Sequence, residues 1–454
     1  MSTENALSGS FELLPLKLQK LETALTEPRY MVVLIGQGKR FMIAAKLADV
    51  IVQLQQKKSL EQAARDLSLL WQQEVAPEAL CQIIERQMLP QGMVCPAGQA
   101  PPISQLGQLT AKKQKPLLER LVIGKFRWQL MPRKVVSTIC SPLTIFYEPL
   151  SVVLAVLLVV ATRWLLYASI DRRFIRQLVL DFTPNEYLAS LALLIAVVLV
   201  HEFGHAAAQL RFDLPAGKIG FQLFHYIPAF FTNVDASWRL TPGRRMVVDV
   251  GGIYFQSIAG SLLFLIYLET RFLPILTTVL ASDILSLVAL NPFLRFDGYW
   301  LVADTLAVPN LSSLSKKLWA QFRQRLLGQK VAAADIPPLS RTRTIAVLAY
   351  GLLRNSFWCL LMVVLAVKIQ SVIANVGGVI LKLILFGLQG LKTGDLSVIL
   401  ASFIRLVLLM LMVLALSTIV AGLILKFAKW CWSVLGRMEQ RPPEQTVGNV
   451  RQTK

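Results

Sequence analysis

The stretch Tyr187–Leu210, YLASLALLIAVVLVHEFGHAAAQL, decides the class of fold. It is apolar as far as Val200, and roughly 20 mostly apolar residues are enough for a helix to cross a bilayer. The string His201-Glu202-Phe203-Gly204-His205 follows at once, so three ionisable groups stand at one end of the segment. The stretch therefore predicts a membrane helix that carries chemistry at its end.

The composition of the whole chain agrees with a membrane protein. The 454 residues are 55% hydrophobic and 16% charged, whereas soluble domains are about 25% charged. The formal net charge is +20, and the basic residues lie between and beside the apolar runs, as anionic headgroups and the positive-inside rule require. We therefore expect the lipid bilayer to be the partner of these charges, and no nucleic acid.

Six apolar segments have the length of membrane spans. Basic residues follow the second and fourth segments and fill the C-terminal tail, so six spans place all of them on the side of the N-terminal region. A seventh apolar segment, 372–391, contains Gly377, Gly378 and Lys382, and we expect it to be re-entrant or interfacial because a seventh span would move the tail across. The six spans are expected at Leu150–Tyr167, Tyr187–Leu210, Met246–Leu268, Phe272–Pro292, Thr344–Val367 and Ser397–Leu425.

The region before the first span predicts a small folded domain. Tyr30–Ile35 and Arg40–Ile43 flank a Gly36-Gln37-Gly38 turn, which is typical of a β-hairpin. Helices are expected to follow at Ala45–Leu54, at Leu60–Gln73 and from Pro77 to about Met88. A hairpin with three short helices indicates a winged-helix fold. The chain starts without a signal-peptide pattern, so we expect this domain to lie in the cytoplasm.

Together these patterns predict a mainly α, polytopic helical membrane protein with about six transmembrane helices, preceded by a small α+β winged-helix-like cytoplasmic domain. The expected location is the inner, or cytoplasmic, membrane. The segment Lys112–Lys134 mixes basic and apolar residues, which is typical of a linker in the membrane interface. An amphipathic linker packed on protein is the alternative.

The motif at 201–205 predicts a metal site. Two histidines four residues apart share one face of a helix, where their imidazoles can bind one Zn²⁺. Glu202 then lies within reach of a water molecule at that ion and can act as its general base. The alternative, histidines that only pack at a helix end, must accept several ionisable groups beside a membrane span, which is costly. The five cysteines form no C-x-x-C pair, which argues against a thiolate site.

A catalytic zinc ion normally has three protein ligands, so a third ligand is expected elsewhere in the chain. Asp297 is favoured because Pro292 before it ends regular helix and Gly298 after it permits a tight backbone, so irregular chain can line a cavity there. Asp249 could instead form an ion pair with Arg245 one turn away. The remaining candidates are Asp283, Asp304 and His225. The chain has three histidines, and His225 is the one outside the motif.

HEFGH at the end of one span, with an Asn…Asp-Gly motif closing a later span, resembles the site-2 protease family of intramembrane zinc metalloproteases. The resemblance covers about 145–306 and implies zinc ligands at His201, His205 and Asp297 with Glu202 catalytic. It also implies that Asn291 steadies the substrate carbonyl, although Asn291 is closer to the aspartate than in many members. Gln256 stands where many members have an asparagine signature in the third span.

Asn-Pro-Phe-Leu-Arg-Phe-Asp-Gly-Tyr (291–299) together with Val-Asp-Ala-Ser-Trp (234–238) is most similar to the peptide zinc metalloprotease subgroup, which is associated with ribosomally made, modified peptides. The N-terminal pattern Arg29-Tyr30, Arg40-Phe41 and Ser59-Leu60-Glu61-Gln62 resembles PqqD-like domains. That resemblance implies a leader peptide bound as an added strand, and a peptide-modifying enzyme or exporter as a partner. The expected parts are 1–100, the PqqD-like domain; 101–144, the basic interfacial linker; 145–310, the catalytic membrane core; 311–343, a basic cytoplasmic loop; and 344–454, the C-terminal membrane helices and basic tail.

The function expected from these features is a membrane-embedded zinc endopeptidase that cleaves a peptide or a membrane-associated substrate. Such a substrate must be extended, and the aromatic and β-branched stretch 217–238 could supply an edge strand that holds it so. The alternative is a non-proteolytic peptide exporter, immunity protein or zinc carrier, which the intramembrane residues Asp283 and Arg354 favour. Glu202 favours the protease, because a carrier has no use for a general base between its ligands.

Overall fold

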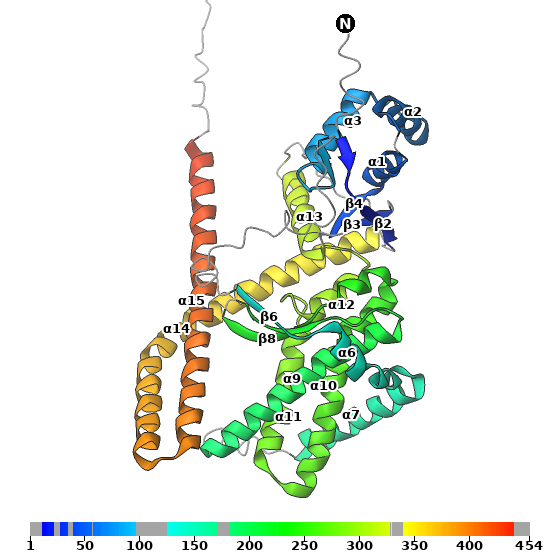
Figure 1. Cartoon of the computed structure of the whole chain (residues 1–454). Helices are drawn as coiled ribbons and strands as arrows, with labels where there is room; N and C mark the ends of the chain where they lie inside the picture. Colours follow the sequence, from blue (N-terminus) through cyan, green and yellow to red (C-terminus); the bar gives the residue numbers. More distant parts are fainter. Residues whose placement is uncertain are drawn as a thin grey trace, which may run out of the picture. The chain divides into compact units, whose positions relative to one another are not determined.

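The computed structural model describes residues 11–21, 28–34, 40–56, 58–96, 125–169, 182–224, 226–326, 328 and 339–439. These residues are mainly helical, with a small N-terminal α/β region and three small sheets. The predicted fold class, a helical membrane protein with an N-terminal α+β region, is confirmed (Figure 1).

The N-terminal region contains the predicted hairpin and helices. The hairpin strands pair antiparallel, with Val32 opposite Phe41, while the turn at 36–38 lies outside the described residues. A third strand joins the hairpin on its other side, so that β3 is central. The elements are β2 (Leu16–Leu21), β3 (Arg29–Leu34), β4 (Arg40–Ala44), α1 (Ala45–Gln55), α2 (Leu60–Trp71), α3 (Pro77–Ile83) and the π turn η2 (Ile84–Met88). A separate pair, β1 (Phe11–Leu13) and β5 (Val94–Pro96), was not expected from the sequence.

Local capping and a shared core explain why this region folds. Ser59 accepts a hydrogen bond from the backbone of Gln62, whose side chain accepts one from the backbone of Ser59, so α2 begins with a capping box. The apolar side chains of strands and helices then meet in one core, whose most buried members include Val32, Leu34, Ile51, Leu67, Leu80 and Met88.

Six helical segments of the described chain are long and apolar enough to cross a membrane, as in a multi-pass membrane protein. Many of their outward side chains are large and apolar, for example Trp164, which is 76% exposed. The segments are α7 (Pro149–Ser169), α9 (Pro184–Arg211), α10 (Pro242–Thr270), Arg341–Lys368 and Ile373–Thr393 of α14 (Arg341–Thr393), and Leu396–Gly422 of α15 (Leu396–Glu439).

The set of six differs from the predicted set at two places. The segment 372–391, expected to be re-entrant or interfacial, is regular helix within α14 and is long and apolar enough to cross a membrane; its position relative to the bilayer stays a prediction. Gly377 and Gly378 cost a helix only about 1 kcal/mol each, and Lys382 is exposed and can extend its stem toward a polar surface. The segment expected at 272–292 is instead the shorter apolar helix α11 (Leu273–Ala289).

The segment 125–131 has a secondary structure that the sequence analysis did not expect. It forms the strand β6 (Lys125–Met131), in a sheet ordered β6-β7-β8, while 112–124 lie outside the described residues; its place in the membrane interface stays a prediction. Phe126 and Trp128 alternate with polar residues and stack at 5.6 Å, a period of two that the basic composition hid. The predicted strand within 217–238 is confirmed as β7 (Ile219–Phe224) and β8 (Ile227–Thr232), followed by η4 (Asp235–Arg239).

The helices α9 and α10 pack closely together and support the candidate site (Figure 1). A short helix and a turn, α6 (Arg133–Cys140) and η3 (Pro142–Tyr147), pack on α9 through a core that includes Val136, Ala206 and Phe255. Burial raises the pKa of the Cys140 thiol in this core to about 12, so Cys140 packs as a small apolar side chain. The elements α12 (Asp297–Thr305) and α13 (Leu311–Leu326) follow α11, and α12 packs on α10.

Candidate metal centre

The helix α9 positions the two histidines. It starts with Pro184 at its first turn and a capping box in which the Thr183 side chain and the Glu186 side chain each accept from the other's backbone N–H. At its other end His201 and His205 lie one turn apart and are buried, with exposed fractions of 8% and 6%. Their rings meet edge to face, with centroids 4.9 Å apart. The predicted arrangement on one helix face is therefore present in the structure.

The start of α12 brings a carboxylate to the histidines. The Asp297 Oδ2 atom lies 3.1 Å from His201 Nε2 and 3.6 Å from His205 Nε2, and the two Nε2 atoms are 3.2 Å apart. Among the described residues these three side chains form a group whose ligand atoms could hold a metal ion. The structure thus brings together the three residues that the sequence predicted.

These distances fit a tetrahedral metal. Bonds of about 2.0–2.1 Å at tetrahedral angles place neighbouring ligand atoms about 3.3 Å apart, which is the spacing of the three atoms here. The hydrogen bonds at the other ring nitrogens agree with this role: His201 Nδ1 is 2.8 Å from the Gln256 side-chain oxygen, and His205 Nδ1 is 2.7 Å from the Val248 carbonyl. Both partners are acceptors, so both Nδ1 atoms carry the proton and both Nε2 lone pairs are left for a metal. The residues fit zinc.

Gly252 on α10 leaves the space in front of the histidines open. A Cβ at this position would lie within 3.0 Å of the Nε2 atoms of both histidines. A side chain at residue 252 would therefore occupy the place where the ligand atoms converge.

We expect Gly252→Ala to lower the zinc content of the purified protein well below one ion per chain, because the added methyl group collides with both nitrogens. Gly243→Ala is the matched control, since a Cβ on Gly243, in the same helix, meets nothing within 4 Å. Metal analysis of both variants checks this. Full zinc in Gly252→Ala would mean that the metal does not bind between the two Nε2 atoms.

Glu202 follows His201 in the sequence and is buried, with an exposed fraction of 6%. Its backbone carbonyl accepts a hydrogen bond of 3.0 Å from the Thr232 hydroxyl, at the end of β8. The strand therefore ends at the turn of α9 that carries the predicted base.

The other predicted ligand candidates have different surroundings. Asp283 is bound by Arg163, and Asp304 by Arg245, in each case through hydrogen-bonded ion pairs. Because Arg245 pairs with Asp304, the expected pairing of Arg245 with Asp249 is not the one that the structure shows. Asp249 is buried, and its Oδ2 atom has no hydrogen-bond partner.

His225 lies outside the described residues. Asn291 stands in the turn between α11 and α12, where its side-chain oxygen accepts a 2.9 Å hydrogen bond from the Phe293 N–H. Its predicted contact with a substrate carbonyl remains a prediction.

Two hydrogen bonds at the site were not predicted. The first joins His205 Nδ1 to the Val248 carbonyl, and a backbone acceptor leaves no side-chain pattern in a sequence. Tyr147 donates a 2.8 Å hydrogen bond from its hydroxyl to the Gly204 carbonyl, between the histidines. Burial raises the pKa of Tyr147 above its ordinary value, so this hydroxyl stays protonated and donates. The sequence signal available for the contact of Tyr147 with α9 was the apolar, aromatic segment before the first span.

The comparisons with known proteins agree with this site at a coarse level. The chain is similar to a protein of Bacillus subtilis named "Putative peptide zinc metalloprotease protein YydH", with 26% identity over 142 residues. The matched part is 31% of this chain and 56% of the relative, so the chain spans about half the length of the relative. No protein-family model matches the chain, and no solved structure matches it significantly. A distant likeness to a zinc metalloprotease thus accompanies a group that can bind a metal.

Proposed function

We propose that this chain is a membrane-embedded zinc endopeptidase of the site-2 protease type. The observation that carries the proposal is the convergence of two buried imidazole nitrogens and the Asp297 carboxylate, with Glu202 between the histidines on the same helix. A buried carboxylate that is not one of the three ligands is what metal-assisted hydrolysis needs and mere metal storage does not. The distant relative's name supports the same class of reaction.

The chain's own residues divide the chemistry between them. A bound zinc ion would act as a Lewis acid on water and on the scissile carbonyl. The Glu202 carboxylate accepts a proton from the attacking water and delivers it to the leaving amine. Asn291 is proposed to donate from its amide nitrogen to the substrate oxygen, since its Oδ1 is already held by Phe293.

The substrate is proposed to be extended where it meets these groups. A peptide bond within a helix is shielded because its carbonyl is hydrogen-bonded, so cleavage needs the chain to be unwound. The hydrogen bond from Thr232 to the Glu202 carbonyl joins the end of β8 to the catalytic turn and supports substrate binding beside this strand.

We further propose that residues 1–100 select the substrate. The sheet β2-β3-β4 ends in β2 and β4 among the described strands, and a leader peptide could pair with such an edge. A ribosomally made, modified peptide and its modifying enzyme or exporter are the proposed partners. We place the chain in the cytoplasmic membrane with this region on the cytoplasmic side, which the basic residues Arg211, Arg239 and Arg244 support.

Metal removal tests the proposed function. The full-length protein would be reconstituted in lipid vesicles with a pool of synthetic peptides that carry apolar segments, and mass spectrometry would identify the products. We expect cleavage to stop after treatment with a chelator and to return with added zinc. Removal of residues 1–100 should slow the cleavage of selected peptides and leave zinc content unchanged. Identical products from the chelated protein would refute a zinc peptidase.

The alternative of a non-proteolytic exporter, immunity protein or zinc carrier gains no specific observation. The two charged residues that favoured this alternative, Asp283 and Arg354, both have partners. Asp283 pairs with Arg163, and the Arg354 guanidinium donates to the Ser312 hydroxyl and carbonyl. These contacts account for both charges without a transport path.

A further inference from the structure

The Gln256 side chain on α10 bridges the candidate metal centre and α11. Its Oε1 atom lies 2.8 Å from His201 Nδ1, and its Nε2 atom donates a 2.7 Å hydrogen bond to the Ser282 carbonyl. Gln256 is 3% exposed, so both contacts lie away from solvent. Each polar atom of this buried amide is therefore used.

We propose that Gln256 is the positioning residue of the metal centre, and that a buried ion pair between α7 and α11 holds it in register. The inference rests on the metal-binding part of the proposed function and not on peptide cleavage.

The Ser282 carbonyl decides which way the Gln256 amide points. A carbonyl can only accept, so the amide NH₂ must face Ser282 and the amide oxygen must face His201. If the amide were turned the other way, its oxygen would face the Ser282 carbonyl oxygen and the two would repel. Its NH₂ group would then donate to His201 Nδ1, and the ring proton would have to move to Nε2. That tautomer cannot bind a metal through Nε2. The contact with Ser282 therefore keeps the Nε2 lone pair of His201 available.

Two groups accept a hydrogen bond from a histidine Nδ1 atom at this site, and Gln256 is the one whose position can change. The partner of His205 Nδ1 is a backbone carbonyl, that of Val248, which the helix α10 fixes. The partner of His201 Nδ1 is a flexible side chain, whose geometry depends on α11. Hydrogen bonds to metal-binding histidines typically change metal affinity by 10- to 100-fold, so loss of the hydrogen bond between His201 and Gln256 should change the zinc affinity measurably.

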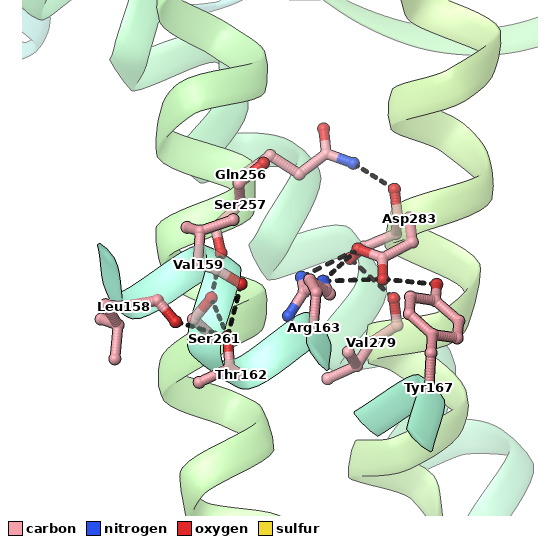
Figure 2. A network of polar contacts seen from close by, with 11 residues as sticks. Leu158, Val159, Thr162, Arg163, Tyr167, Gln256, Ser257, Ser261, Val279 and Asp283 are labelled. Atoms are coloured by element: carbon pink, nitrogen blue, oxygen red, sulfur yellow. Dashed lines mark hydrogen bonds and ion pairs between the residues drawn. The ribbon is translucent and has the colours of Figure 1, made fainter. Parts of the chain in front are cut away.

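The turn of α11 that offers Ser282 is tied to α7 by charge. Arg163 donates from Nε and Nη2 to Asp283 Oδ1 at 3.0 and 2.8 Å, and the Tyr167 hydroxyl donates to Asp283 Oδ2 at 2.8 Å (Figure 2). The Arg163 and Asp283 side chains are only 16% and 17% exposed. Gly260 makes room for the guanidinium, because a Cβ there would lie 2.6 Å from Arg163 Nη2.

A buried charge pair between apolar helices resists movement, because separating the charges would leave each one unpaired in a poorly solvated place. A second polar contact, 2.9 Å between the Thr162 and Ser261 hydroxyls, joins α7 to α10 beside it (Figure 2). Polar contacts thus join α7 to both α10 and α11. The contacts form a chain from Arg163 through Asp283, Ser282 and Gln256 to His201.

Zinc affinity of the full-length protein in detergent micelles tests the proposal, measured by competition with a coloured chelator. Gln256→Leu should raise the zinc Kd by about 10- to 100-fold, because nothing then accepts the His201 Nδ1 proton. Gln256→Glu retains the acceptor and should bind zinc more tightly than Gln256→Leu. Gln209→Leu is the matched control: Gln209 is equally buried on α9, and among the described residues its side chain bonds to the backbone of Gly217 and Asn233 and not to a histidine, so its loss should leave the zinc Kd unchanged.

The role of the ion pair is tested by combining variants. Asp283→Asn should raise the zinc Kd in the wild-type background and should have no further effect in the Gln256→Leu background, because the connection is already broken there. Equal increases in both backgrounds would overturn the link between the ion pair and Gln256. Wild-type affinity in Gln256→Leu, or equal weakening in Gln209→Leu, would overturn the positioning role. Since no cleavage is measured, these outcomes are separate from a failure of the protease proposal.

Discussion

Glu202→Gln should leave the protein folded with its zinc bound and should lower the rate of peptide cleavage by about 10²- to 10⁴-fold, the range that a positioned general base contributes. The amide is nearly the same size as the carboxylate, and the fixed contact at this residue, from Thr232, is made to the backbone carbonyl. Only the ability to accept a proton is lost.

The matched control for this variant is Glu186→Gln, on the same helix. Glu186 accepts hydrogen bonds from the Thr183 backbone and hydroxyl at the exposed start of α9, and glutamine can accept there too. The control should keep both zinc and activity. Metal analysis and product yields on both variants decide the matter. Cleavage by Glu202→Gln at the wild-type rate would remove Glu202 from the mechanism and would favour a role for the metal site other than proteolysis.

The parts of the site that the sequence predicts are those with a local cause. His201 and His205 share a helix face because of their spacing, and the apolar run before them predicts the helix itself. Asp297 was favoured because a proline and a glycine near it predict irregular chain. Neither argument needs knowledge of a distant contact.

The parts that the sequence could not decide depend on contacts between distant residues. Arg163 and Asp283 are 120 residues apart, so a pattern analysis could not show that Asp283 is occupied and unavailable as a ligand. The same holds for β6, whose partner β7 lies far along the chain and whose basic residues resembled those of a membrane interface. The segment 372–391 was expected to be re-entrant or interfacial because a seventh span would move the basic tail across the membrane; it is regular helix within α14, since its glycines each cost a helix little.

The largest effect on stability is expected at the ion pair of Arg245 and Asp304. Arg245 is 3% exposed and donates to Asp304 from Nε and Nη2 at 2.9 and 2.7 Å. This pair ties the end of α12 to α10, and α12 begins with Asp297 about two helical turns earlier. Asp304→Asn should lower the free energy of unfolding by about 3–5 kcal/mol, because it leaves a buried arginine charge without its counter-ion.

Two further variants show whether the charge or the packing is responsible. Glu148→Gln breaks the exposed pair with Arg211, whose side chains are 52% and 41% exposed, and should cost no more than about 1 kcal/mol. The double variant Arg245→Met with Asp304→Leu removes both charges and should recover most of the loss, since apolar residues of similar volume can replace a buried pair.

Unfolding in mixed micelles gives the free energies for all three proteins, and metal analysis gives their zinc content. If α12 carries Asp297 to the histidines through this pair, Asp304→Asn should lose zinc as well as stability, while Glu148→Gln should lose neither. Unchanged zinc in a destabilised Asp304→Asn protein would show that the turn at 291–296, and not the contact at the far end of α12, holds Asp297 in place. The anchor for the third ligand would then be the Asn291 hydrogen bond to Phe293, with the ion pair serving only the packing of α12 on α10.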